Sequence, residues 1–264
     1  MSGLHIGALD DAAWGSPWRR RRVGEKVACS MGLVLTALLA PTWPGTLLVA
    51  VAAIALIVGA ARIRPRVLLT AMSAPIVFLI LGAISVLFSV GTAPADAWWH
   101  AAFLSVGPTS VAQAARLFAH GLSGTLAVMV LATTTPMVDL LTWLRRLRGP
   151  DPLLEIASLT YRLLFVLAET TANVLAAQRC RLGDNPVGRW NGLSRRWHNT
   201  AAAVGAIGLR AWDRSSRLTE GLAHRGFETS LVTLPVPRVA SPRLITATVV
   251  VLAAIWSISL VVAR

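Results

Sequence analysis

The sequence predicts an all-α, polytopic membrane protein with about five transmembrane helices and a cytoplasmic domain of long, crossed helices. Of its 264 residues, 55% are hydrophobic, and several apolar runs approach the ~20 residues that cross a ~30 Å hydrocarbon core. The formal net charge is +13, and because Lys26 is the single lysine, nearly all of the 25 basic residues are arginine. These arginines cluster between the apolar runs, which indicates membrane topology and partner docking and not nucleic-acid binding.

Five apolar runs are expected to span the membrane: 27–41, 45–61, 67–90, 111–134 and 244–263. Basic residues precede the first run and follow the second and fourth, whereas 91–110 has none. By the positive-inside rule, the N-terminus faces the cytoplasm, while 91–110 and the C-terminus lie outside. The chain then divides into a cytoplasmic N-terminal segment, four spans, a cytoplasmic coupling domain and a last span: 1–26, 27–136, 137–243 and 244–264.

The stretch 155–177 is apolar, but its charges follow a helical pattern. Glu155, Arg162 and Glu169 are seven residues apart, which places them on one helix face, and apolar residues occupy another. This pattern favours an amphipathic helix at the membrane surface or beneath the bundle. A sixth span is the alternative.

The cytoplasmic domain is expected to contain two long helices. The first covers 155–182 and stops at Gly183, and the second runs from about 199 to 225 and stops at Gly226. Asp213 with Arg217, and Glu220 with His224, are spaced for ion pairs along the second helix. A face of small and apolar residues on this helix is expected to cross the first helix closely: Gly205, Gly208, Trp212, Ser215, Thr219 and Leu222.

Each of these helices ends in an arginine–glycine motif. The first motif is Ala-Gln-Arg-Cys-Arg-Leu-Gly over 177–183, and the second is Leu-Ala-His-Arg-Gly-Phe over 222–227. Either motif alone is typical of an ordinary helix end, because arginine complements the helix dipole and glycine adopts the left-handed conformation. Two such ends in one cytoplasmic segment favour a docking device for a two-lobed partner, whose carboxylates or helix-end carbonyls would bind the arginines.

These motifs, with Tyr161-Arg162, Glu169 and Arg217-Leu218, resemble the coupling region of the transmembrane (T) component of energy-coupling factor (ECF) transporters. The similarity is closest to the cobalt and nickel branch, CbiQ. Ser16-Pro17-Trp18-Arg19 is similar to the opening signature of that branch, so the resemblance covers most of the chain. His224 departs from the alanine that is more frequent in the family.

The resemblance implies a non-catalytic, multi-pass subunit in the cell membrane of a prokaryote. Two ABC ATPases would dock on the two coupling helices and bind ATP, and this chain would hold a substrate-binding (S) membrane subunit without a cofactor of its own. ATP-driven closure would tilt the S subunit and release cobalt or nickel ions. The resemblance assigns ATPase docking to Gln178, Arg179, Arg181, Gly183, Ala223, Arg225 and Gly226, and support of the coupling helices to Arg162, Glu169, Arg217 and Glu220. Arg179 and Arg181 are alternative groove-docking residues, with Arg181 favoured.

Other functions have weaker support in the sequence. The lone lysine has no P-loop context, so the chain itself is not the ATPase. Five scattered histidines provide no ligand pair for a metal. A T component for a vitamin such as biotin is the main alternative. A membrane-embedded transferase would need a set of carboxylates that Asp139, Asp151 and Glu155 do not form, and a secondary transporter would need broken, repeated spans.

Overall fold

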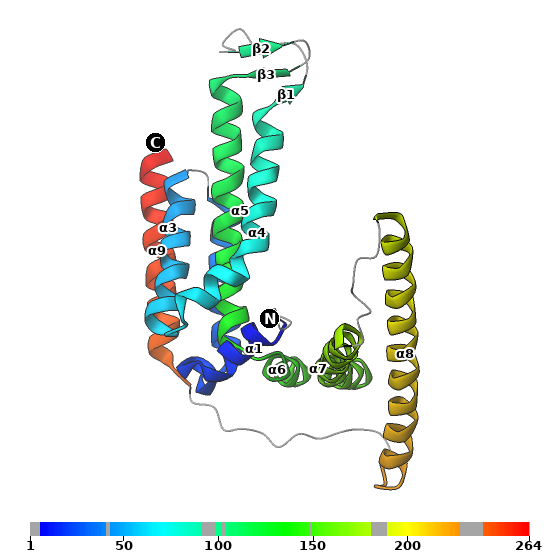
Figure 1. The fold of residues 1–264 in the computed structure, drawn as a ribbon. Coiled ribbons are helices and arrows are strands. Elements are labelled where there is room, and N and C mark those ends of the chain that lie inside the picture. Colours follow the sequence, from blue (N-terminus) through cyan, green and yellow to red (C-terminus); the bar gives the residue numbers. More distant parts are fainter. Residues whose placement is uncertain are drawn as a thin grey trace. The chain divides into compact units, whose positions relative to one another are not determined.

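The computed structural model describes residues 6–40, 43–90, 99–101, 104–147, 149–180, 189–227 and 240–263. It divides the chain into two compact units. The membrane unit comprises 8–140 and 236–264, and the arm unit comprises 1–7 and 141–235. Helices account for most of the described residues, which confirms the predicted all-α class (Figure 1).

The membrane unit begins with a short helix and a 3₁₀ turn that lead into a bundle of longer helices (Figure 1). Pro17–Arg20 form the 3₁₀ turn, and the Oγ atom of Ser16 accepts a hydrogen bond from the Trp18 N–H at 3.2 Å. The helix that starts at Trp43 continues into a π-helical turn, Ala55–Ala60. The helices are α1 Ile6–Gly15, α2 Val23–Leu39, α3 Trp43–Ile54, α4 Pro65–Leu87, α5 Pro108–Thr134 and α9 Pro242–Ala263.

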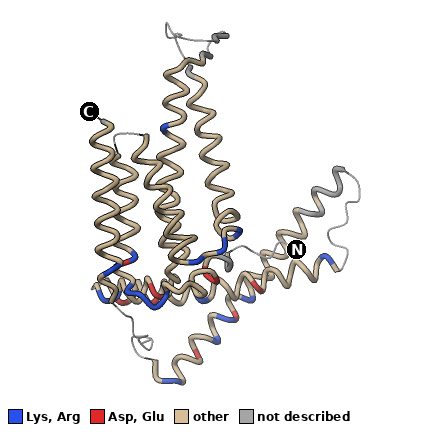
Figure 2. Tube along the Cα trace, turned by 90° about the vertical axis from the view of Figure 1, so that its left-hand side faces the viewer, with Lys and Arg blue, Asp and Glu red and all other residues tan. Residues whose placement is uncertain are grey.

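Four helical segments in the described part of the chain are long and apolar enough to cross a membrane: Trp43–Ala60, Pro65–Leu87, Pro108–Thr134 and Pro242–Val262. They correspond to the last four of the five predicted spans. The first predicted span, 27–41, corresponds to α2, which has 17 residues. At 1.5 Å per residue α2 is about 26 Å long, shorter than a typical hydrocarbon core. The spans are almost without charge along their length (Figure 2).

A small sheet that the sequence did not predict lies in the connection between α4 and α5 (Figure 1). Its strands are β1 Ser89–Val90, β2 Trp99–Ala101 and β3 Leu104–Val106. The strand order is β1-β3-β2, and both pairings are antiparallel, with Val90 opposite Leu104 and His100 opposite Ser105. Such short strands have too few residues to produce a clear alternation of apolar and polar side chains.

The core of the membrane unit combines apolar packing with buried polar contacts. Leu33 of α2, Val49 of α3 and Val130 of α5 are almost completely buried in one cluster. Lys26 of α2 is fully buried, and its Nζ atom donates to the carbonyl oxygen of Thr134 at 2.9 Å. One turn along α2, Ser30 donates to the carbonyl of Ala127 at 2.7 Å. Lys26 thus binds a carbonyl at the C-terminal end of α5, where intrahelical partners are lacking.

The arm unit contains the two long helices, and α6, Met137–Arg146, connects the two units. α7 covers Asp151–Cys180 and α8 covers Arg189–Ala223. The helices begin earlier than the predicted positions 155 and 199. Asp151 and Pro152 suit a first helical turn, and once nucleated a helix propagates through residues such as Trp190 and Arg195 that have no strong stop signal.

Candidate functional site

The end of α8 forms a Schellman motif at the second arginine–glycine sequence. The Phe227 N–H donates to the Leu222 carbonyl at 3.0 Å, and the Gly226 N–H donates to the Ala223 carbonyl at 3.1 Å. Gly226 has a φ of +70°, the left-handed conformation that this motif requires and that glycine adopts without a steric cost. Two hydrogen bonds and one glycine therefore fix the direction in which the chain leaves α8.

Arg225 lies immediately before this glycine and is exposed to solvent. Ala223 and His224 are also exposed, so three successive side chains of the motif are accessible to a partner. Glu220 is exposed one turn earlier, and its carbonyl accepts the His224 N–H at 3.0 Å. The capping geometry explains the glycine of the motif but leaves the exposed arginine without a structural role.

The first motif lies at the end of α7, where the described residues stop at Cys180. The Nε2 atom of Gln178 donates to the Asn199 carbonyl at 3.2 Å and so joins α7 to α8. Arg179 and Cys180 are exposed. Arg181 and Gly183 lie outside the described residues, so their predicted role in docking stays a prediction.

α7 and α8 cross within the arm unit (Figure 1). Gly205, Gly208 and Trp212 of the predicted face lie away from this contact, whereas Ser215 lines a hollow between the two helices. Ala203 is 3% exposed, close to the Gln178–Asn199 hydrogen bond. Gly205 and Gly208 were expected at the crossing, but a side chain added at either would meet nothing within 4 Å. The prediction was wrong because it assigned the contact to small residues, whereas Ala203 and Ala206 on the arginine-bearing side are also small.

A hollow of about 780 Å³ lies between α7 and α8 beside this crossing. Leu163, Val166, Leu167 and Thr170 line it from α7, and Arg210, Arg214, Arg217 and Leu218 are among its residues on α8. The aliphatic stems of arginine can cover leucine and valine side chains while the guanidinium groups stay in water. Arg217, predicted to support the coupling helices, thus lies at the surface shared by the two helices.

The opposite side of α8, here called the outer face, is apolar and exposed. It carries Trp197, Val204 and Trp212, which are 79%, 63% and 74% exposed, together with Gly205 and Gly208. At 100° per residue these five positions fall within about a third of the helix circumference, away from Ala203 and Arg210. An apolar face of this kind marks a contact with a membrane or a protein partner. Gly205, Gly208 and Trp212 of this face were predicted to share one side of the helix but were assigned to the crossing with α7.

The other predicted support residues, Arg162 and Glu169, are exposed on α7, whereas Glu155 of the same seven-residue series is 7% exposed. Neither predicted ion pair of α8, Asp213 with Arg217 or Glu220 with His224, forms in the described structure. Exposed pairs of this kind contribute only about 0.3–0.5 kcal/mol, little more than the entropy lost in ordering two long side chains.

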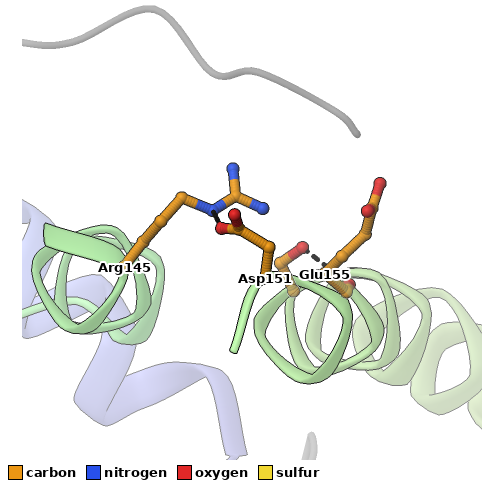
Figure 3. A network of polar contacts seen from close by, with 4 residues as sticks. Arg145, Asp151 and Glu155 are labelled. Atoms are coloured by element: carbon orange, nitrogen blue, oxygen red, sulfur yellow. Dashed lines mark hydrogen bonds and ion pairs between the residues drawn. The ribbon is translucent and has the colours of Figure 1, made fainter. Parts of the chain in front are cut away.

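An ion pair joins α6 to α7 at the start of the arm unit (Figure 3). The Nε atom of Arg145 lies 3.1 Å from the Oδ1 atom of Asp151. One turn into α7, the Oγ atom of Ser158 donates to the Glu155 carbonyl at 2.9 Å. Asp151 therefore stabilises the turn between α6 and α7. In the described part of the chain, no group of three or more histidine, cysteine, aspartate or glutamate residues is arranged to hold a metal ion.

The chain is similar in sequence to known membrane transport proteins. Residues 15–234 match the protein family described as CbiQ, cobalt transport protein. The chain is 36% identical over 240 residues to the cobalt transport protein CbiQ of Rhodobacter capsulatus, covering 90% of this chain and 92% of that protein. It is 28% identical over 158 residues to the cobalt transport protein CbiQ of Salmonella typhimurium, covering 57% of this chain and 66% of that protein. It is 24% identical over 223 residues to a protein of Methanocorpusculum labreanum named as a fused cobalt transport protein CbiMQ, covering 83% and 36%.

Proposed function

The chain belongs to the CbiQ family of cobalt transport proteins, and on that premise we propose that it is the non-catalytic T subunit of an ECF importer. In this proposal two ABC ATPases bind α7 and α8, and an S subunit in the membrane carries cobalt ions. The chain resides in the prokaryotic cell membrane with its N-terminus and arm unit in the cytoplasm. It transmits the motion of the ATPases to the S subunit and performs no chemistry itself.

The observation that carries this proposal is the end of α8. A Schellman motif fixes the helix end, and Arg225 is exposed directly beside it. An arginine in such a place is available for charge-assisted, bidentate hydrogen bonds in a partner's groove. Because the end is held by two backbone hydrogen bonds, force applied to Arg225 is transmitted along α8 without first unwinding its last turn.

The outer face of α8 supports a second contact, with the S subunit. Trp197 and Trp212 are large anchors, and Gly205 and Gly208 between them allow a helix backbone to approach closely. On the other side of α8, Gln178 and Asn199 fasten it to α7. Movement imposed at Arg225 would then reach the membrane partner through one helix whose two faces have separate contacts, as a two-state coupling element requires.

The experiment is co-purification of the tagged chain with the ATPase and S subunits expressed beside it. We expect Arg181→Glu/Arg225→Glu to lose the ATPase and to retain the S subunit, because each buried charge-assisted contact is worth about 2–5 kcal/mol. The matched control is Arg146→Glu/Arg243→Glu, which reverses two exposed arginines outside the motifs and should retain both partners. Binding of the ATPase by the motif variant as well as by wild type would refute the docking role.

The transported substrate is tested separately, by uptake into cells that express all subunits. Cobalt accumulation that depends on this chain, with competition by nickel and none by biotin, is the expected result. Uptake of biotin without uptake of cobalt would refute the assignment to cobalt and support the vitamin alternative. If the subunits co-purify but no cobalt is taken up, the assignment of cobalt as substrate is wrong while the docking role stands.

A further inference from the structure

A group of arginines lies at one end of the membrane unit. Two short segments contribute: the 3₁₀ turn with the two residues after it, and the connection between the π-helical turn and α4 together with the first two residues of α4. Charged residues gather at this end of the spans (Figure 2). The arginine belt, as we call it, consists of Arg19, Arg20, Arg21, Arg22, Arg62, Arg64 and Arg66.

The fold holds the two segments together. Trp18, Ala61 and Ile63 are 3%, 0% and 5% exposed and belong to the same apolar cluster, and the Oγ atom of Ser16 donates to the Ala61 carbonyl at 3.5 Å. Since Ala61 and Ile63 point inward, Arg62 and Arg64 between and after them are exposed. Burial of the intervening residues therefore directs the arginines of the connection outward as a group.

Two guanidinium groups, one in the 3₁₀ turn and one directly after it, lie over tryptophan rings. The Cζ atom of Arg19 lies 3.9 Å from the centre of the Trp14 ring, and that of Arg21 lies 4.9 Å from the centre of the Trp18 ring. The structure gives none of the seven arginines a carboxylate partner among the described residues. Nearby Glu25 instead accepts the Ser241 N–H on both carboxylate oxygens, at 3.1 and 3.2 Å. The positive charge of the belt is thus uncompensated within this part of the chain.

Arg62 occupies a position where glycine would be favoured. Its φ of +53° is the one positive value among the described non-glycine residues, and it follows the π-helical turn. The Ile63 N–H donates to the Ile57 carbonyl at 3.1 Å, a hydrogen bond that this reversal permits. An arginine kept at a strained position is consistent with use of its side chain.

We propose that the arginine belt binds the phosphate groups of anionic phospholipids. Arginine binds phosphate bidentately, and the belt lies where four spans meet the membrane boundary: the end of the π-helical turn, the start of α4, the end of α5 and the start of α9. Uncompensated arginines beside membrane helices are attracted to anionic headgroups, and the exposed ring of Trp14 suits the same interfacial depth. The bound lipids stabilise the end of the membrane unit from which the chain continues into α6.

The test is native mass spectrometry of the full-length chain in mild detergent, with phosphatidylglycerol or phosphatidylcholine added at equal concentration. Wild type should bind phosphatidylglycerol at least about tenfold more than phosphatidylcholine, as expected for several arginines at an anionic surface. Arg62→Gln/Arg64→Gln/Arg66→Gln should lose most of this preference. The control, Arg146→Gln/Arg210→Gln/Arg214→Gln, removes the same charge from outside the belt and should keep it.

Two further arms keep the result interpretable. Arg62→Lys/Arg64→Lys/Arg66→Lys retains the charge and should keep part of the preference, which distinguishes loss of lipid binding from misfolding of the glutamine variant. Soluble glycerol phosphate should not displace the lipid. Equal binding of both lipids by wild type, an unchanged preference in the glutamine variant, or displacement by glycerol phosphate would each overturn the proposal.

Discussion

Replacing Lys26 by methionine should weaken the contact between α2 and α5 by removing a charge from a buried site. Lys26 is fully buried, and its ammonium group donates to the Thr134 carbonyl at 2.9 Å. Thr134 is the last residue of α5, so its carbonyl has no partner further along the same helix. Methionine keeps the length of the side chain and removes the donor, and a buried acceptor is then left unsatisfied.

The size of the effect follows from two opposing contributions. A hydrogen bond to a charged group contributes about 1.5–3 kcal/mol, and an orphaned buried carbonyl costs about 1–3 kcal/mol. The desolvation of a buried ammonium, several kcal/mol, is relieved by the substitution and offsets part of this loss. The negative end of the α5 helix dipole already stabilises the Lys26 ammonium, so removing this group recovers less desolvation energy. We therefore expect a net loss of about 1–3 kcal/mol in the free energy of unfolding.

The assay is SDS-driven unfolding of the purified chain in mild detergent, with hydrogen exchange along α5 as a local measurement. Ser30→Ala is the matched control, because it removes a neutral hydrogen bond to Ala127 one turn away, worth about 0.5–1.5 kcal/mol. Lys26→Met should cost more than Ser30→Ala, and exchange should rise in the last turn of α5. A methionine variant as stable as wild type, with unchanged exchange in that turn, would refute the reasoning.

Four further substitutions test backbone conformation and close packing. Gly226→Ala should destabilise the end of α8 by about 1–2 kcal/mol, because alanine is strained at a φ of +70°. Limited proteolysis of the segment that follows Ala223 measures this effect, and an unchanged cleavage rate would contradict it. Arg62→Gly should raise the free energy of unfolding by up to about 1 kcal/mol, since glycine relieves the backbone strain at a φ of +53°. A loss of stability in SDS-driven unfolding would show that Arg62 is not strained. Gly45→Ala should destabilise the contact between α3 and α9 by about 1–3 kcal/mol, because its Cβ would meet Ala40 Cβ at 3.2 Å and Ser259 Oγ at 3.0 Å. Gly124→Ala, with open space around its Cβ, should instead stabilise the protein by up to about 1 kcal/mol, so equal melting temperatures for these two variants would argue against the packing.

Much of the fold was predictable from local sequence signals. Long apolar runs predicted α3, α4, α5 and α9, and glycine after a run of helix formers predicted where α8 ends. These features depend on composition and on the conformational freedom of one residue, so they need no knowledge of distant contacts. The starts of α7 and α8 were less predictable because a helix extends until a residue stops it.

The candidate site was predictable only in part. Arg225 and Gly226 were identified from their order in the sequence, and Gly226 adopts the expected conformation. The sequence pattern also separated α8 into an arginine-bearing side and a side with Trp212, Gly205 and Gly208. Which of these sides meets α7 was predicted wrongly, because the hydrophobic pattern of one helix does not identify its partner and arginine stems can cover apolar residues.

The sequence by itself determined the helical membrane class, the positions of four spans and the arginine–glycine end of α8. It did so because hydrocarbon thickness fixes the length of an apolar run, and a left-handed residue at a helix end favours glycine. Only the tertiary structure decided that Lys26 would be buried against Thr134, that Trp18 and Ile63 would bring two arginine segments together, and that the outer face of α8 would be exposed. These outcomes depend on contacts between residues up to 108 positions apart, and such contacts depend on how whole helices pack.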